Sequence, residues 1–213
     1  MWTPDDRALV GDFGSGQALS DDQYHLIEPF IPPPKPGGRP RTTDMRRMLD
    51  GLFYVVRTGC QWRHLPPPPA FPPWQTVYGY FRTFLEAGVW ETIRHYLVMT
   101  LREGREASPT AAIIDSQSVK TGAEARDTIG FDAGKRVKGR KRHLVTDTLG
   151  LMLRIEVHSA SVQDRDGAAL VLDRITRRFP FLERFFADAG YQGPRVAELA
   201  PRPVEIIKRS DAG

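Results

Sequence analysis

Two aspartates in the second half of the chain stand where the sequence pattern could support chemistry. The apolar run from Ala111 to Ile114 is followed by Asp115, and the run from Phe185 to Ala187 is followed by Asp188. Short, wholly apolar runs of this kind predict buried β-strands, here with a carboxylate at the exit of each. Carboxylate oxygens suit magnesium or manganese, because these hard divalent ions prefer oxygen ligands.

A pair of such carboxylates has a chemical use at phosphodiester bonds. Two divalent ions about 3.5 to 4 Å apart can activate an attacking water or hydroxyl and stabilise the leaving oxygen. Asp115 and Asp188 are therefore the candidate catalytic residues and metal ligands. Aspartate is also common in turns at strand ends. The pattern alone leaves both interpretations open for each residue.

The residues around these aspartates predict a mixed sheet that would position them. Two further strands are expected at 140–147 and 151–157, joined by a tight turn at 148–150. The expected elements after them are a helix at about 166–179, a strand at 185–187, a short helix at 196–199 and a strand at 204–207. This is the order of an RNase H-like α/β domain, which carries acidic residues at the ends of its first and fourth strands. We expect this core to span 110–213.

The first half of the chain predicts helices separated by proline-rich segments. Ser20 begins a capping box, and apolar residues recur at helical spacing from Met45 to Val56, before the helix terminator Gly59. Further helices are expected at about 74–88 and 89–102, whereas 32–40 predicts an extended connector with Arg39 and Arg41 on or beside it. We therefore predict a disordered tail at 1–18 and a small helical domain at 19–103.

The helix that begins near Trp74 has a polar side of a kind that suits DNA. In a helix-turn-helix arrangement the second helix enters the major groove and presents its polar side chains to the bases. The polar side here would present Gln75, Thr76, Tyr78, Gly79 and Arg82. The alternative is a helical bundle with no role in DNA binding, because helix pairs are common in many proteins.

A dense basic run follows the first predicted strand. It places six positive charges in eight residues, namely Lys135, Arg136, Lys138, Arg140, Lys141 and Arg142. Contact with DNA phosphates is the natural use of such a run, and binding would then depend steeply on salt. A solvated basic loop is the alternative.

Other polar residues near the predicted core are interpreted as structural. We expect His143 and His158 to form structural hydrogen bonds, because oxygen-preferring ions would not select them. We expect Asp164 and Asp166 to cap the helix that follows them and Asp147 to be a turn residue.

Composition narrows the classes of protein. The 213 residues suffice for two small domains and carry a net charge of +4, so any DNA contact must come from local clusters of basic residues. The single cysteine, Cys60, excludes an intrachain disulfide and a zinc site built on several thiolates. No apolar run approaches the roughly 20 residues of a membrane helix. We expect a cytoplasmic protein with no membrane partner.

Several motifs, in order along residues 19–209, resemble the insertion sequence five family of bacterial DDE transposases. In the first half they are Thr58-Gly-Cys-Gln-Trp-Arg63 and Trp74-Gln-Thr-Val-Tyr78. In the second half they are Ile113-Ile-Asp-Ser-Gln-Ser-Val-Lys-Thr121, Gly139-Arg-Lys-Arg-His143, Val145-Thr-Asp-Thr-Leu-Gly150, Gln163-Asp-Arg-Asp-Gly-Ala168 and Ala187-Asp-Ala-Gly-Tyr-Gln-Gly193.

The resemblance implies DNA transposition by a helical DNA-binding domain joined to an RNase H-like core. Such a transposase binds the terminal repeats of its element as a homodimer, cleaves the strands and joins them to target DNA, using two Mg²⁺ or Mn²⁺ ions. Asp115 matches the first catalytic aspartate and Asp188 the second. Lys120, the last basic residue of the motif around Asp115, is a further candidate DNA contact.

One departure from the family pattern concerns the third acidic residue. The family carries a glutamate on a helix after the fifth strand, and no segment up to Gly213 matches it. Glu198 and Glu205 lie before and within the expected fifth strand. We therefore expect an incomplete core and interpret the chain as a transposase fragment. The alternatives are a catalytically inactive product that binds element ends and inhibits transposition, and an RNase H-like nuclease or resolvase with another set of acidic residues.

Overall fold

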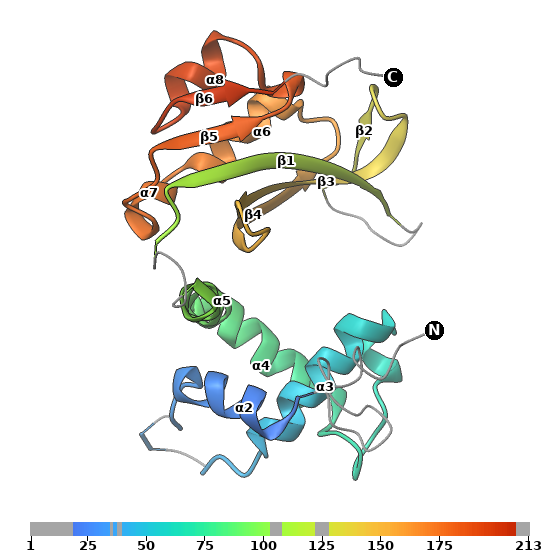
Figure 1. The fold of residues 1–213 in the computed structure, drawn as a ribbon. Helices are drawn as coiled ribbons and strands as arrows, with labels where there is room; N and C mark the ends of the chain where they lie inside the picture. Colours follow the sequence, from blue (N-terminus) through green and yellow to red (C-terminus); the bar gives the residue numbers. More distant parts are fainter. Residues whose placement is uncertain (1–18, 35, 38–39, 103–107, 122–127, 208–213) are drawn as a thin grey trace. The chain divides into compact units, whose positions relative to one another are not determined.

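The chain forms two compact units, Met1–Arg94 and His95–Gly213, in the computed structural model (Figure 1). The structure describes residues 19–34, 36–37, 40–102, 108–121 and 128–207. The tail predicted at 1–18 and the candidate DNA contact Arg39 lie outside these residues.

The first unit is helical, as predicted. Its α2 helix begins with the predicted capping box, in which the Ser20 side chain accepts from the Gln23 N–H and the Gln23 side chain accepts from the Ser20 N–H. The described elements are α2 (Asp21–Ile27), η2 (Glu28–Phe30), α3 (Met45–Thr58), η3 (Trp62–His64), α4 (Trp74–Glu86) and α5 (Val89–Arg102), whose last turns belong to the second unit.

Helix α3 is the centre of the first unit. The Asp44 side chain caps its start by accepting from the Arg47 N–H, and Gly59 ends it in the left-handed conformation at φ 66°. Between these ends its apolar stripe is buried, with Met48 and Leu49 almost wholly inaccessible to solvent. Cys60 follows the terminator and is half-buried, with its N–H donating to the Thr58 hydroxyl.

The second unit contains a six-stranded mixed sheet, which confirms the fold class predicted from the sequence. The strands run in the order β2-β3-β1-β5-β6, and β4 also pairs with β3. β1 is antiparallel to β3 and parallel to β5, and β5 is parallel to β6. Their bounds are β1 (Ala111–Lys120), β2 (Gly130–Asp132), β3 (Val137–Asp147), β4 (Met152–Ser159), β5 (Arg184–Ala187) and β6 (Val204–Ile206).

Three features of this unit differ from the sequence prediction. β1 continues five residues beyond Asp115, so that aspartate lies within the strand and not at its exit. The short strand β2 was not predicted. The helix expected at 166–179 is two helices, α6 (Asp164–Leu172) and α7 (Ile175–Arg178), because Arg174 between them has φ 56°. Such a left-handed residue interrupts a right-handed helix.

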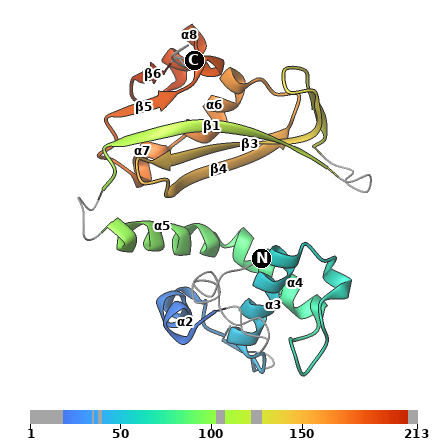
Figure 2. The same ribbon diagram turned by 45° about the vertical axis from the view of Figure 1, so that its right-hand side comes forward.

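One face of the sheet holds the core. Alternate residues of β1 and β3, such as Ala112, Ile114 and Val145, are buried against α6 and α8 (Pro194–Leu199), and we call this the inner face (Figure 2). The opposite face, called outer, carries the other alternate residues, among them Ile113 and Val119, which are exposed. Inner and outer residues therefore follow from the period of two in each strand.

The end of α5 and the β3–β4 turn are joined by a buried ion pair. Asp147 was predicted to be a turn residue, and this is confirmed, because its carboxylate accepts from the N–H groups of Leu149 and Leu151 at 2.9 and 2.8 Å. Its other oxygen accepts from the Arg102 guanidinium. Gly150 completes the tight turn with φ 80°.

Helix α6 approaches β3 closely at Gly167. A Cβ at Gly167 would lie 2.2 Å from Cε1 of the buried His143 ring, closer than side chains can approach. We predict that Gly167→Ala destabilises the protein by about 1–3 kcal/mol, the usual cost of overpacking. Gly79→Ala on α4, where a Cβ would meet nothing within 4 Å, should instead stabilise by up to about 1 kcal/mol through helix propensity. Urea unfolding followed by circular dichroism measures both; equal stability of the two variants would contradict this packing.

Candidate active site

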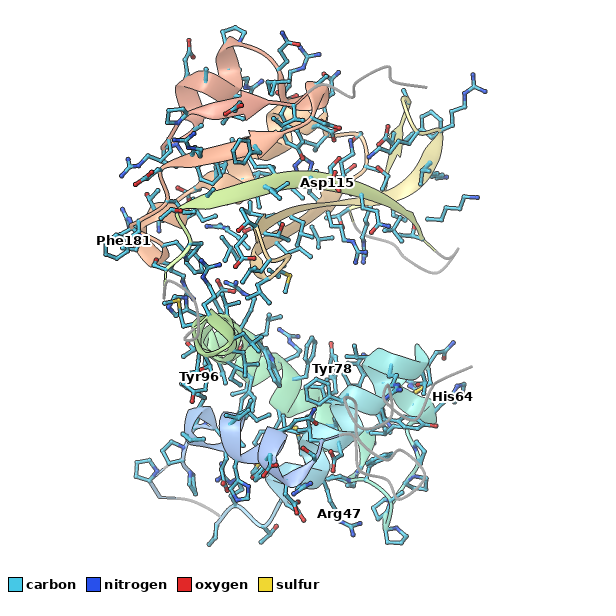
Figure 3. The ribbon with its side chains drawn as sticks, viewed as in Figure 1. Arg47, His64, Tyr78, Tyr96, Asp115 and Phe181 are labelled. Atoms are coloured by element: carbon cyan, nitrogen blue, oxygen red, sulfur yellow. The ribbon has the colours of Figure 1, made fainter. Side chains whose placement is uncertain are left out.

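The two aspartates predicted to hold metal lie at the same level of two adjacent strands, Asp115 within β1 and Asp188 directly after β5. The parallel register of β1 and β5 pairs Ile114 with Ala187, so the next residues along the two strands are Asp115 and Asp188. Both are exposed. Alternation along β1 places the Asp115 side chain on the outer face of the sheet, whereas Asp188 directly follows β5 and its side chain caps the short turn η4 (Ala189–Tyr191). Figure 3 marks Asp115 on β1.

Each of these carboxylates has one oxygen held by a backbone N–H. Asp115 Oδ1 accepts from the Ser116 N–H at 2.7 Å, and Asp188 Oδ1 accepts from the Gly190 N–H at 2.9 Å. Within the described ranges, the Oδ2 atoms have no hydrogen bond or ion pair. The local backbone therefore orients both side chains and leaves one oxygen of each available to a ligand.

A third aspartate, Asp164, lies behind this pair. A Cβ at Gly190 would be 3.0 Å from Asp188 Oδ1 and 3.1 Å from Asp164 Oδ2, so those two oxygens lie within about 6 Å of each other. The sequence predicted that Asp164 caps α6, and this is wrong, because its Oδ1 instead accepts from Ser116 Oγ and Lys141 Nζ, at 2.8 and 2.9 Å. Asp166 does not cap α6 either and pairs with Arg195 at 2.6 Å.

Lys141 is the centre of a buried ion triad. Its Nζ lies 3.1 Å from Asp132 Oδ2 and 2.9 Å from Asp164 Oδ1, and its side chain is 5% exposed. Burial alone would lower the lysine pKa, but hydrogen bonds to Asp164 and Asp132 raise it. The pKa of each aspartate is lowered although burial opposes this, because Lys141 and a serine hydroxyl donate to each. All three groups are therefore charged at neutral pH.

The prediction that Lys141 contacts DNA is wrong, whereas other basic residues of the same run are accessible to solvent. Lys141 is buried between two carboxylates, so it does not present its charge to a phosphate. Within the same run Arg136 is exposed in the β2–β3 turn and Lys138 at the start of β3, and Lys135 is exposed although its Nζ donates to the Ser116 carbonyl at 3.0 Å. The remaining candidates are Arg140, which is half-buried, Arg142, which is exposed and donates to Gln117, and Lys120, which is exposed at the end of β1.

Two histidines at the triad have structural contacts, as predicted. His143 is fully buried, its ring contacts those of His158 and Tyr191, and its Nδ1 lies 3.3 Å from the Tyr191 hydroxyl. His158 Nδ1 lies 2.9 Å from the Ser159 carbonyl. Burial, with the nearby His158 next in importance, lowers the pKa of His143 to about 4. The same burial and the aspartates raise the pKa of Tyr191.

The described residues contain no group of three or more His, Cys, Asp or Glu side chains that could hold a metal ion. The pair Asp115 and Asp188 nevertheless supplies exposed oxygen donors at the same level of two adjacent strands, which is the donor type that a hard divalent ion needs. Glu198 and Glu205 are also exposed, on α8 and β6.

The candidate DNA contacts of the first unit lie partly on the surface. Gln75 and Arg82 are exposed on α4, where Arg82 pairs with Glu86 at 2.8 Å, and Thr76 is half-buried. Tyr78, labelled in Figure 3, is exposed and packs edge-on against Trp62 with ring centroids 5.1 Å apart. Arg41 is half-buried and donates to the Pro32 carbonyl at 2.7 Å. No described helix is long and apolar enough to cross a membrane.

Sequence reasoning missed the residues that support the aspartates. Asp132 was not singled out, and Ser116 and Ser118 entered only as parts of a motif, although Ser118 Oγ donates to Asp132 at 2.5 Å. The one available signal was the alternation in β1 and β3 that places Ser116, Ser118 and Lys141 on the inner face. Polar residues at alternate buried positions indicate an internal network.

Comparison with known proteins matches both units of the chain. A family model described as a putative transposase of the IS4/5 family matches residues 19–94. A second, described as a transposase DDE domain, matches residues 106–204.

Two relatives show similarity over about half of the chain. A 16.2 kDa protein of the insertion element IS402 from Burkholderia cepacia is 33% identical over 107 residues, which cover 48% of this chain and 72% of the relative. The protein y4sN of Sinorhizobium fredii (strain NBRC 101917 / NGR234) is 30% identical over 128 residues, which cover 54% of this chain and 96% of the relative. No solved structure matches the chain.

The buried His143 predicts a specific loss of stability in acid. Its folded pKa of about 4 lies below the ordinary histidine value of 6.5, so protonation favours the unfolded chain. As the pH falls from 6.5 to 4, the free energy of unfolding should decrease by up to about 3 kcal/mol from this residue. His143→Gln should flatten that dependence in urea titrations, whereas His64→Gln, at an exposed position, should leave it unchanged. A wild-type slope in His143→Gln would refute the assignment.

Proposed function

The chain belongs to the IS4/5 family of DDE transposases, and we propose that it binds the ends of an insertion element and cleaves DNA with Asp115 and Asp188. Members of this family act in DNA transposition, which implies binding to DNA, and DDE domains generally use divalent metal ions. The element ends, the strand chemistry, the choice of Mg²⁺ or Mn²⁺ and the homodimer belong to the proposal.

The observation that supports a strand-cleaving role is the register of β1 and β5. It brings two exposed carboxylates to the same level of adjacent parallel strands, although Asp115 and Asp188 are 73 residues apart in the sequence. A structural role as turn residues does not explain Asp115, which lies inside a strand. Each carboxylate also has one oxygen held by a backbone N–H.

The two carboxylates are suited to hold ions at a phosphodiester. When bound, divalent ions of this type polarise the phosphate and lower the pKa of a nucleophilic water. Asp115 and Asp188 would hold them through the oxygens that lack a partner within the described ranges. Their charge also repels a DNA phosphate when no cation is present, so the residues themselves make DNA approach depend on the ion.

DNA would approach the second unit at the turn between β2 and β3. Arg136 and Lys138 project there in exposed positions, and Lys135 of the same turn donates to the Ser116 carbonyl beside Asp115. Phosphate contacts fix the register of a bound strand without reading its sequence. Recognition of the element end is assigned to the exposed residues Gln75 and Arg82 of α4.

Metal binding tests the role of the aspartates. Titration with Mn²⁺, followed by the electron paramagnetic resonance signal of the free ion, should show binding to the wild-type chain. Asp115→Asn and Asp188→Asn should each weaken that binding at least about tenfold, because each removes a ligand. Glu198→Gln, which removes an equally exposed acid on α8, should bind as wild type. Equal binding by all four proteins would reject the site.

The salt dependence of DNA binding tests whether the basic residues at the β2–β3 turn contact DNA phosphates. Replacing Arg136 and Lys138 with glutamine should reduce the slope of log K against log salt by roughly 1.8, as expected when two phosphate contacts are lost. The control replaces Arg177 and Arg184, exposed on α7 and at the start of β5, and should leave the slope unchanged. Equal slopes in both double variants would remove the β2–β3 turn from the DNA interface.

Strand cleavage distinguishes the proposed enzyme from the alternative of a protein that only binds DNA. With Mg²⁺ or Mn²⁺, the proposal predicts nicking of DNA that carries the element end and none with Asp115→Asn. Binding without cleavage, by a chain that still binds Mn²⁺, would instead support the inhibitory role.

A further inference from the structure

We propose that Ser116 is a positioning residue, which transmits the order of the buried triad to the carboxylate of Asp115. This inference rests on the proposed function, because it assumes that Asp115 holds a metal ion. It adds a role for the inner face of the sheet, which supports the outer-face carboxylate from behind.

The N–H, hydroxyl and carbonyl groups of Ser116 all form hydrogen bonds. Its N–H donates to Asp115 Oδ1 at 2.7 Å, and its hydroxyl donates to Asp164 Oδ1 at 2.8 Å. Lys135 Nζ donates to its carbonyl at 3.0 Å and lies 3.3 Å from its hydroxyl. Ser116 itself is only 8% exposed, which limits the access of competing water to its hydroxyl.

The anchor of Ser116 is itself fixed. Asp164 lies in the first turn of α6 and forms an ion pair with Lys141. Lys141 forms a second ion pair with Asp132, the last residue of the short strand β2. The hydroxyl of Ser116 therefore connects β1 to a charged group that α6, β2 and β3 share. A small shift of β1 at Ser116 would stretch a bond to a buried charge, which costs more than a bond at the surface.

The hydrogen bond from the Ser116 N–H to Asp115 Oδ1 fixes the orientation of the candidate ligand, because the backbone of Ser116 is itself held in place. A carboxylate that has one oxygen held keeps the other in a defined direction, so less side-chain entropy is lost when an ion binds. Hydrogen-bond partners behind a metal ligand typically contribute 10- to 100-fold to metal affinity. The same arrangement recurs at Asp188, whose held oxygen lies beside Gly190, near Asp164.

Ser118 provides a matched control on the same strand and the same face. Its hydroxyl donates to the triad as well, to Asp132 Oδ2 at 2.5 Å, but it is not bonded to Asp115. If the serine bonds only stabilise the fold, Ser116→Ala and Ser118→Ala should have the same consequences. If Ser116 positions Asp115, only Ser116→Ala should change metal affinity.

The experiment measures Mn²⁺ affinity and thermal stability for the wild-type chain, Ser116→Ala, Ser116→Thr and Ser118→Ala. We expect Ser116→Ala to weaken Mn²⁺ binding about tenfold. Ser116→Thr, which keeps the hydroxyl, should bind Mn²⁺ within about threefold of wild type. Ser118→Ala should bind Mn²⁺ as wild type does. Its melting temperature should be no higher than that of Ser116→Ala, so that a loss of stability alone does not explain a loss of affinity.

Two outcomes overturn the inference, and they differ from failure of the proposed function. Wild-type Mn²⁺ affinity in Ser116→Ala, or an equal loss in Ser116→Ala and Ser118→Ala, would show that Ser116 is only structural, while loss of binding in Asp115→Asn would still support the metal site. Wild-type Mn²⁺ affinity in Asp115→Asn would defeat the proposed function itself, and the inference with it.

Discussion

The second unit depends on the burial of one positive charge, the ammonium group of Lys141. A lone ammonium in this position would be costly, and removing one partner of a buried ion pair typically costs about 3–5 kcal/mol. Asp132 and Asp164 supply the compensation at 3.1 and 2.9 Å. Because these partners come from β2 and from the first turn of α6, satisfying Lys141 fixes both elements against β3.

This constraint divides the inner face of the sheet into two regions. Towards the start of β1, Ala112 and Ile114 pack in the apolar core; further along the same face, Ser116 and Ser118 donate to the triad. The candidate carboxylate Asp115 lies at the boundary between these two regions, on the opposite face of the sheet. The apolar region holds the parallel strands in register, and the charged region orders the backbone next to the carboxylate.

The sequence was sufficient to predict most of the helices and strands, because apolar periodicity is a local signal, but not β2 or the break between α6 and α7. It did not predict that Lys141 is buried. Within a run of six basic residues it is indistinguishable from its neighbours, and only the register of β3 directs it inward. Asp164 was assigned to helix capping for a similar reason: its partners Ser116 and Lys141 are 48 and 23 residues away. Side-chain partners of high sequence separation have no local signal.

Asp115 and Asp188 are proposed to hold a divalent ion together, and the most direct test is a crystal structure of the chain grown with Mn²⁺, with anomalous scattering used to locate the ion. We predict an anomalous peak coordinated by one oxygen of each aspartate, with the Ser116 and Gly190 N–H groups still bonded to the other oxygens. Manganese bound elsewhere, with both aspartates free of it, would show that the two residues do not form a metal site.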